Sequence, residues 1–285
     1  MFKIAICQIL GSAAAEIDEN KRETRRTAER YIRDAAEKGA DFAVLPEMWN
    51  CPYANRYFRA YAETADGETV KKMSALAKDL GIYLIGGTIP EWEGETDKLY
   101  NTCFAFDRQG KIIGKHRKAH LFDIDVKDRV LADGTVKKGI TFQESKSFSP
   151  GAGSTIIETE FGKMGIAVCF DVRFPELFRK MALEGAQLIF LPGAFNMTTG
   201  PAHWDLSMRA RALDNQVFMV AAAPARDENG VYLSFGNSCV VEPFGSFIAH
   251  ADEKECLLLA DIDLAQVAVV REELPFLKNR RPEIY

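Results

Sequence analysis

A cysteine stands where an apolar run gives way to charged residues. The stretch is GIAVCFDVRFPEL, residues 165–177, with Cys169 after the apolar run and Pro175 placed to start a helix. A thiol near a helix N-terminus meets backbone N–H groups and the positive end of the helix dipole, which favour the nucleophilic thiolate. The N–H of Phe170 can face a developing oxyanion in the same turn. We therefore predict a nucleophilic cysteine, with a buried structural thiol as the alternative.

A glutamate occupies a comparable position earlier in the chain. Glu47 directly follows FAVLP, residues 42–46, which has the composition of a short buried strand. A carboxylate held at such a strand end can act as a general base, and a solvated loop acid is the alternative. Sites in open α/β sheets gather at the carboxyl ends of strands. We expect Glu47 and Cys169 to point into one cleft.

A basic segment, KHRKAHLF at residues 115–122, offers two further kinds of chemistry. It can be a basic surface turn, or it can turn Lys118 inward as a fixed positive charge. His116 and His120 leave open a papain-like pairing of cysteine with histidine. Sequence spacing alone does not decide which of these side chains lies beside Cys169.

The elements that must position these residues alternate between strand-like and helix-like segments. The patterns predict strands at 3–9, 42–47 and 82–91, helices at 17–39 and 69–81, and hairpins at 101–118 and 154–168, turning at Gln109–Gly110 and near Gly162. Strands that alternate with helices pair in parallel, whereas hairpins are antiparallel. A mixed sheet follows.

Two short passages occur twice, which indicates an internal repeat. IAIC at 4–7 resembles IAVC at 166–169, and GADFAVLPEMW at 39–49 resembles GAQLIFLPGAF at 185–195. We interpret the chain as two similar α/β halves whose sheets pack face to face with helices outside. The predicted fold is a four-layer α-β-β-α sandwich with mixed sheets. Since no Pro/Gly/Ser-rich linker separates the halves, residues 1–285 are predicted to form a single domain.

Composition limits the partners. The chain is 47% hydrophobic with a net charge of −5 and a pI near 5.6. No window approaches the roughly 20 apolar residues that cross a membrane, and the N-terminus does not resemble a signal peptide. Nucleic acid would require a basic patch, which the interspersed charges do not provide. We predict a cytoplasmic protein that binds neither membrane nor nucleic acid.

The six cysteines are scattered, and none forms a C-x-x-C pair. This spacing argues against a structural zinc site, a redox dithiol and a metal- or thiol-binding protein. Without a secretion signal, most of the thiols are expected to be reduced and to act as small buried hydrophobes. No metal is predicted.

Taken together, the motifs resemble the nitrilase superfamily of carbon–nitrogen hydrolases over nearly the whole chain. They are VLPEMW around Glu47, RKAHLF around Lys118 and CFDVRFPEL around Cys169, in the order of that family. The resemblance implies a Glu–Lys–Cys triad in a four-layer sandwich, assembled as a homodimer or larger homo-oligomer. It implies that Cys169 attacks a small-molecule amide, Glu47 transfers protons, and Lys118 with the Phe170 N–H stabilises the oxyanion, without metal or cofactor.

Further motifs resemble the ω-amidase branch of this superfamily. They are FDID at 122–125, ITFQES at 140–145, GAFNMTTGPAHW at 193–204 and RALDNQVFMVAAAPARD at 211–227. That branch hydrolyses the terminal amide of short α-keto dicarboxylic acid monoamides such as α-ketoglutaramate and α-ketosuccinamate. The resemblance implies that Glu144 orients Lys118 and the substrate amide. Another amidase of the superfamily, for example one acting on deaminated glutathione, and an inactive scaffold remain alternatives.

Such substrates carry a carboxylate at the end away from the scissile amide. Arg173 lies four positions after the cysteine and can grip a carboxylate with two hydrogen bonds. A salt bridge from Arg173 to Asp171, Glu176 or another acid is the alternative. The resemblance and the loop positions add three substrate-binding residues: Thr199 as a hydroxyl donor, Phe195 as a wall, and Tyr53 closing the other side.

The segment DVKDRVLADGTVKKG, residues 125–139, is longer than we expect for ω-amidases. It is polar and has a turn sequence at Asp133–Gly134. We predict a mobile hairpin or lid near the mouth of the site or at a subunit interface, where it would affect substrate size more than reaction type.

Overall fold

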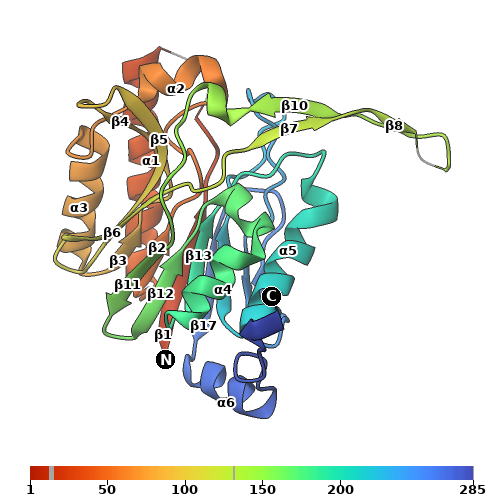
Figure 1. Ribbon diagram of the computed structural model, residues 1–285. Helices are drawn as coiled ribbons and strands as arrows, with labels where there is room; N and C mark the ends of the chain where they lie inside the picture. Colours follow the sequence, from red (N-terminus) through yellow and green to blue (C-terminus); the bar gives the residue numbers. More distant parts are fainter. Residues whose placement is uncertain (13–15, 131, 285) are drawn as a thin grey trace.

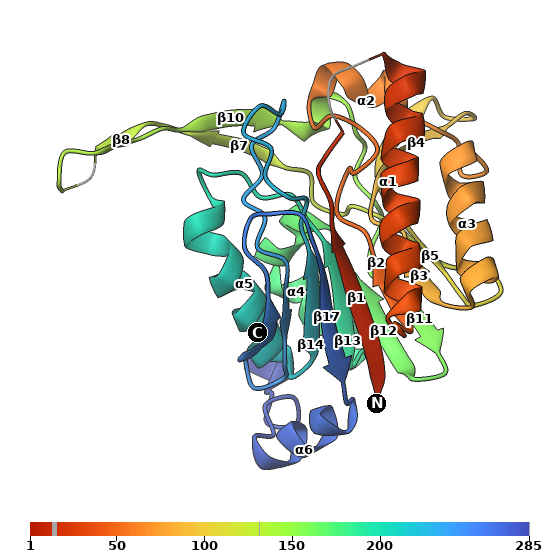
Figure 2. The ribbon, with the colours of Figure 1, turned by 180° about the vertical axis from the view of Figure 1, so that it is seen from behind.

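The computed structural model describes residues 1–12, 16–130 and 132–284, which fold into two sheets packed face to face (Figures 1 and 2). Helices cover the outer face of each sheet, so the layers run α-β-β-α. Both sheets contain parallel and antiparallel pairs. The fold predicted from the sequence is therefore confirmed.

The first sheet has the order β17-β1-β2-β3-β5-β4, with β6 paired to β5. Its strands are β1 (Phe2–Gln8), β2 (Phe42–Val44), β3 (Tyr83–Ile85), β4 (Ile89–Glu93), β5 (Lys98–Phe106), β6 (Ile112–Arg117) and β17 (Cys256–Ile262). Helices α1 (Ile17–Glu37) and α3 (Glu68–Leu80) cover its outer face, and α2 (Asn55–Tyr61) lies at one end (Figure 1).

The second sheet has the order β11-β12-β13-β14-β15-β16. Its strands are β11 (Thr155–Thr159), β12 (Gly162–Ile166), β13 (Leu188–Pro192), β14 (Phe218–Ala222), β15 (Cys239–Val241) and β16 (Phe247–His250). Helices α4 (Pro175–Leu183) and α5 (Gly200–Asn215) cover its outer face, and α6 (Ala265–Glu273) follows β17 (Figure 2). Pro175 occupies the first turn of α4, as predicted.

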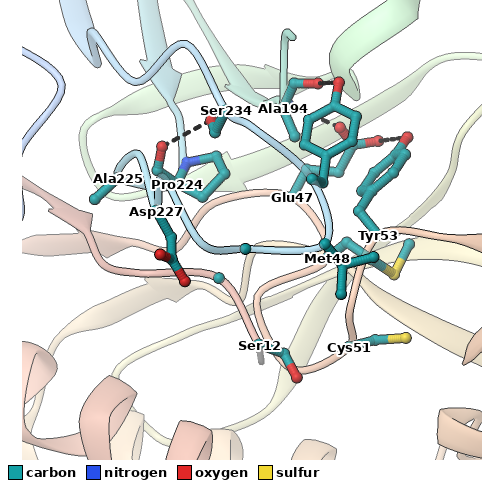
Figure 3. Close-up of a pocket in the computed structure, with 14 residues that line it drawn as sticks. Ser12, Glu47, Met48, Cys51, Tyr53, Ala194, Pro224, Ala225, Asp227 and Ser234 are labelled. Carbon is teal, nitrogen blue, oxygen red and sulfur yellow. Dashed lines mark hydrogen bonds between the residues drawn. The ribbon is translucent and has the colours of Figure 1, made fainter. Parts of the chain in front are cut away.

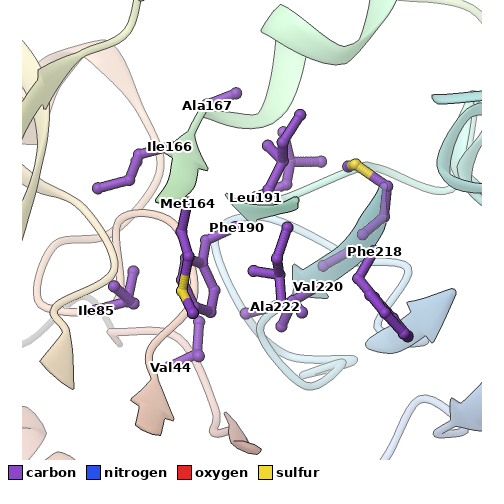
Figure 4. Packing of buried hydrophobic residues seen from close by; sticks show 14 of the residues in the cluster. Val44, Ile85, Met164, Ile166, Ala167, Phe190, Leu191, Phe218, Val220 and Ala222 are labelled. Carbon is purple, nitrogen blue, oxygen red and sulfur yellow. The ribbon is translucent and has the colours of Figure 1, made fainter. Parts of the chain in front are cut away.

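The core between the sheets follows the two-residue period of the strands. Along β1, Ile4 and Ile6 pack between the sheets, whereas Ala5 and Cys7 face the helices of the first sheet. Val44 and Ile85 of the first sheet meet Met164, Phe190 and other side chains of the second (Figure 4). Alternation of this kind fixes the register, since a slip by one residue would exchange the two faces.

Both predicted hairpins are present, but the predicted strand at 82–91 is not a single strand. The chain forms β3 and β4 with a bend at Gly86–Thr88 between them. Gly87 has φ +60°, and a Cβ there would collide with the carbonyl oxygen of Pro46. The bend holds the neighbouring loop, since Thr88 Oγ1 accepts from the Met48 N–H at 2.9 Å. The predicted strand is interrupted because its backbone packs closely against the loop that contains Pro46 and Met48.

The predicted hairpin within residues 125–139 belongs to a longer two-stranded arm, described over residues 123–130 and 132–143. The arm comprises β7 (Asp123–Val126), β8 (Arg129–Val130), β9 (Val136–Lys137) and β10 (Ile140–Gln143). Gly134, at the predicted turn, has φ +85°. Both ribbon views show the arm projecting outward from the layers (Figures 1 and 2). The segment is therefore a hairpin, as predicted, whereas its mobility and its role as a lid or at a subunit interface remain predictions.

No helix within the described ranges combines the length and apolar character needed to span a membrane.

Candidate active site

Glu47, Lys118, Glu144 and Cys169 meet in one buried cluster, although they come from distant parts of the chain. Lys118 Nζ lies 2.9 Å from Glu47 Oε1 and 2.8 Å from Glu144 Oε2. The Cys169 thiol donates to the Ala194 carbonyl at 3.9 Å, and the N–H of Ala194 donates to Glu47 Oε2 at 2.8 Å. The exposed fraction of each of the four residues is 3% or less. Burial excludes water, so the charges in this cluster act strongly on one another.

Glu47 follows β2 by three residues and is held from several directions. Its Oε2 accepts from the Ala194 N–H at 2.8 Å, a contact between the two halves of the chain. Its Oε1 accepts from Lys118, from Asn101 Nδ2 at 2.8 Å and from the Tyr53 hydroxyl at 3.3 Å. Figure 3 shows Glu47 between Tyr53 and Ala194. These bonds fix the direction in which the carboxylate faces the thiol.

Lys118 is turned inward, which is one of the two alternatives that the sequence left open and the one that the resemblance implies. Burial alone would lower the pKa of Lys118, but the charges of Glu144 and Glu47 raise it well above its ordinary value. Glu144 begins a short 3-10 turn after β10, where it also accepts from the Phe122 N–H at 2.6 Å. Lys118 is therefore a fixed cation between two glutamates.

Cys169 corrects one expectation. Local sequence favoured a thiolate, but burial and the charge of Glu47 raise the pKa of Cys169 well above its ordinary value. Cys169 begins a five-residue 3-10 turn, Cys169–Arg173, and α4 starts only at Pro175, so the dipole of that helix is not at the sulfur. The raised pKa favours the neutral thiol in the resting site, where the charge of Glu47 acts on it.

The backbone at Cys169 forms a tight elbow. Its φ of +45° is uncommon for a residue with a side chain. Phe170, at the second position of the 3-10 turn, has no carbonyl within the turn to which its N–H can bond. The assignment of this N–H to an oxyanion remains a prediction.

Both histidines of the basic segment bond to Asp171 rather than to Cys169. His116 Nε2 lies 3.1 Å from Asp171 Oδ2, and His120 Nδ1 lies 2.8 Å from Oδ1. Asp171 also accepts from the N–H groups of Val168 and His120, both at 2.9 Å. Burial alone would raise the pKa of Asp171. The hydrogen bonds that it accepts, that from His116 above all, instead hold this pKa far below its ordinary value. The geometry does not favour a papain-like pair.

Arg173 lies beside this elbow and has no acid partner in the described part of the chain. Its guanidinium carbon is 4.9 Å from the ring centre of Phe195 and 5.5 Å from that of Phe170. Nη1 donates to His203 Nδ1 at 3.1 Å, and the buried Nε has no hydrogen-bond partner among the described residues. Since Asp171 is occupied by the histidines, the alternative of a salt bridge to it is not seen. Burial lowers the pKa of Arg173.

The other predicted substrate-binding residues are placed differently from one another. Phe195 lies against Arg173, as a pocket wall would. The Tyr53 hydroxyl belongs to the carboxylate cluster, at 3.3 Å from Glu47 and 3.4 Å from Glu144. Thr199 donates its hydroxyl to Asn196 at 3.3 Å, so the structure does not direct it to Arg173. Its role in substrate binding stays a prediction.

Two residues near the cluster were not predicted. Asn101 Nδ2 donates to both glutamates, at 2.8 Å to Glu47 and 3.0 Å to Glu144. A polar residue within the apolar run LYNTCFAF was the available sign of this role. The Tyr232 hydroxyl donates to the Ala194 carbonyl at 2.7 Å, and its ring lies 4.8 Å from that of Tyr53. Tyr232 comes from an irregular loop that no sequence pattern marked.

A pocket of ≈ 430 Å³, open solvent included, adjoins the cluster on the side of Glu47 (Figure 3). It is lined by Gly11, Ser12, Tyr53, Ala194 and residues of the loop from Pro224 to Ser234, Tyr232 among them.

Comparison with known proteins decides the family. The family model described as "Carbon-nitrogen hydrolase" matches residues 3–272. The chain belongs to the carbon–nitrogen hydrolase family. The crystal structure of Saccharomyces cerevisiae Nit3, described as a member of branch 10 of the nitrilase superfamily, is similar to this carbon–nitrogen hydrolase with a TM-score of 0.86. It is 38% identical in sequence, and the match covers 98% of this chain and 96% of Nit3.

Curated relatives of this carbon–nitrogen hydrolase match over its full length. Omega-amidase NIT2 of Xenopus tropicalis is 46% identical over 284 residues, covering 100% of this chain and 96% of the relative. Omega-amidase NIT2 of Mus musculus is 44% identical with the same coverage. The resemblance drawn from the motifs is therefore confirmed at the level of the family.

Proposed function

We propose that this carbon–nitrogen hydrolase is an ω-amidase. It hydrolyses the terminal amide of short α-keto dicarboxylic acid monoamides, α-ketoglutaramate and α-ketosuccinamate among them, to the dicarboxylic acid and ammonia. Relatives named omega-amidase support this proposal at 46% and 44% identity. The observation that carries it is Arg173, a half-buried cation beside the nucleophile elbow with no acid partner among the described residues.

The first half of the reaction forms a thioester. Glu47 accepts the thiol proton of Cys169, and the sulfur attacks the amide carbonyl carbon. The negative charge that develops on the carbonyl oxygen is stabilised by Lys118 and the Phe170 N–H. The C–N bond then breaks, and Glu47 returns the proton to the departing ammonia. Glu47 suits both steps because its bonds to Asn101 and to the Ala194 N–H hold it beside the thiol.

The second half removes the acyl group. Glu47 accepts a proton from water, whose oxygen attacks the thioester carbonyl, and the same cation and N–H stabilise the second oxyanion. Collapse of this intermediate breaks the C–S bond, and the proton on Glu47 returns to the sulfur. Glu144 holds Lys118 in place through the 2.8 Å ion pair and is placed near enough to the cluster to orient the substrate amide.

Arg173 orients the substrate by binding the carboxylate at the end away from the scissile amide. The substrates are short, so a group that binds their distal carboxylate must lie close to Cys169. Arg173 is four residues further along the same turn, where its guanidinium lies against the rings of Phe170 and Phe195. Its Nε has no hydrogen-bond partner among the described residues and is left to bind a carboxylate. A neutral amide of similar length would lack this contact.

Ammonia release from a panel of amides tests the proposal. The panel contains α-ketoglutaramate, α-ketosuccinamate, deaminated glutathione and a neutral amide of similar length, each with wild type and with Cys169→Ala. We expect the α-keto monoamides to have the highest kcat/KM and Cys169→Ala to be inactive. A preference for deaminated glutathione would support the alternative amidase, and no hydrolysis of any amide would support an inactive scaffold.

Assembly as a homodimer or larger oligomer and a cytoplasmic location remain predictions of the sequence.

A further inference from the structure

The arm has an unusual arrangement of positive charge. The register of β8 and β9 places Arg129 directly opposite Lys137, and like charges in that position destabilise a strand pair. Over the ranges that the structure describes, neither side chain has an acidic partner within ion-pair distance. Two neighbouring lysines differ in this respect, since Lys127 pairs with Asp125 at 2.6 Å and Lys138 pairs with Asp128 at 2.8 Å.

These two cations lie beside the point where the arm contacts the start of α5. The Thr198 hydroxyl, just before α5, donates to the Lys138 carbonyl at 3.4 Å, so this part of the arm touches the start of α5. In both ribbon views the arm passes the N-terminal end of α5 (Figures 1 and 2). His203, in the first turn of α5, accepts from Arg173 at 3.1 Å. Contacts at the start of α5 thus connect the arm, through His203, to Arg173.

The pKa of His203 reflects its partial burial together with the positive charges of Arg173 and of the arm. Partial burial, followed by the positive charges of Arg173, Lys137 and Arg129, lowers the pKa of His203. The imidazole is therefore neutral near pH 7 and can accept the proton of the Arg173 guanidinium. Among the residues that the structure places, no carboxylate balances Arg129, Lys137 or Arg173, so the arrangement suits an external anion.

An anionic substrate needs such help because the chain as a whole carries a net charge of −5. A local positive path raises the encounter rate of an anion with a negatively charged protein. We propose that Arg129 and Lys137 form an outer anion-binding site, where the substrate carboxylate is held before it passes to Arg173. This inference rests on the proposed function, because it takes the anion to be the distal carboxylate of an ω-amide.

A pair of matched double variants tests the outer site. Arg129→Gln with Lys137→Gln removes two positive charges at the proposed site. Lys127→Gln with Lys138→Gln removes two from the same arm, where each lysine has its own acid. For the first variant, we expect KM for α-ketoglutaramate to rise about three- to tenfold with little change in kcat. Its kcat/KM should also depend less on salt between about 0.01 M and 0.1 M ionic strength.

The control variant and a neutral amide of similar length should both behave as in wild type. Equal changes in the two double variants would show a general effect of charge and overturn the outer site. An unchanged KM in the first variant, or an equal rise for the neutral amide, would overturn it as well.

A binding measurement separates this inference from the proposed function. If wild type does not hydrolyse α-ketoglutaramate, the proposed function fails, and the outer site is tested by calorimetry with 2-oxoglutarate on Cys169→Ala. Weaker binding when Arg129→Gln and Lys137→Gln are added, but not when the control pair is added, supports an outer anion site. Equal binding in all three proteins would contradict it.

Discussion

Proton placement at the active-site residues determines when the sulfur becomes reactive. The pKa of Cys169 is raised by burial and by Glu47, whereas Lys118 stays charged between Glu47 and Glu144. A neutral thiol reacts slowly with oxidants and alkylating agents, because the thiolate is the nucleophile. Under the proposed mechanism, the thiol therefore loses its proton as it attacks the substrate, not before.

Labelling with iodoacetamide checks this arrangement. A raised pKa means that the thiolate fraction of Cys169 is small near neutral pH and grows only above the ordinary pKa of a cysteine, about 8.5. We expect the rate of Cys169 alkylation in the free enzyme to keep rising through pH 9, as followed by mass spectrometry. A rate that is already at its plateau at pH 7 would show a resting thiolate.

Removing the sulfur should stop the reaction without unfolding the protein. Cys169→Ala deletes one atom in a buried turn and is expected to cost about 1 kcal/mol of the free energy of unfolding. During turnover of wild type, mass spectrometry should detect an acyl adduct on Cys169. An adduct on Cys51 or Cys239 instead would contradict the assignment of the nucleophile.

Glu47→Gln should lower kcat by about a hundredfold or more, because it removes the base. Lys118→Met should also lower kcat strongly, and it leaves Glu47 and Glu144 buried without their cation, which costs roughly 3–5 kcal/mol of stability. Adding Glu144→Gln to Lys118→Met should restore part of the stability but no activity. A crippling effect of His116→Ala alongside a near-normal Glu47→Gln would favour a cysteine–histidine mechanism.

Arg173→Lys should raise KM for α-ketoglutaramate and lower kcat/KM by about ten- to a hundredfold, through loss of a charged hydrogen bond. The same change should affect a neutral amide of similar length much less. Steady-state kinetics with both substrates measure the difference. Equal losses on both would mean that Arg173 supports the elbow and not the substrate carboxylate.

At the scale of elements, the motifs predicted the site residues better than they predicted the loops and bends that hold those residues in place. Glu47, Lys118 and Cys169 each follow a strand. Apolar runs ending in a polar residue marked Glu47 and Cys169, whereas Lys118 lies in a basic segment and was chosen from the family resemblance. The bend at Gly86–Thr88 was missed because its cause is a contact with the distant Met48 loop, not a local pattern. The raised pKa of Cys169 was missed for a similar reason, since burial depends on the whole fold.

Shortening the arm tests an element independently of the chemistry. Val126 of β7 lies opposite Ile140 of β10, so an Asn-Gly turn in place of residues 127–139 can close the hairpin. We expect little change in melting temperature or in kcat, but a changed KM profile for anionic amides or a changed oligomer mass. Substrate kinetics and light scattering that both match wild type would show that the arm has neither role.

At the scale of the whole molecule, the two halves share one active site and one core. Ala194 of the second half donates to Glu47 of the first, and the residues buried between the sheets come from both. β17, close to the C-terminal end, returns to pair with β1 along its whole length. The first sheet therefore includes a strand from the second half, and the active site includes groups from both halves.

Thermal unfolding is therefore expected to be a single cooperative transition, as the predicted single domain requires. Calorimetry should give a calorimetric enthalpy equal to the van't Hoff enthalpy if the process is reversible. Two separate transitions would show that the halves unfold as independent units.

The root of the arm also makes this protein a candidate host for inserted sequences. Glu144 is tied to the Phe122 N–H at 2.6 Å, and Asp123 accepts from the Ser145 N–H at 3.0 Å, so both ends of the excursion are fastened together where it leaves the body. Whatever lies beyond this clamp can change in length without pulling on Lys118 or Glu144. A peptide tag, an affinity loop or a small reporter domain placed near Gly134 would thus be displayed away from the layers while the enzyme continues to work.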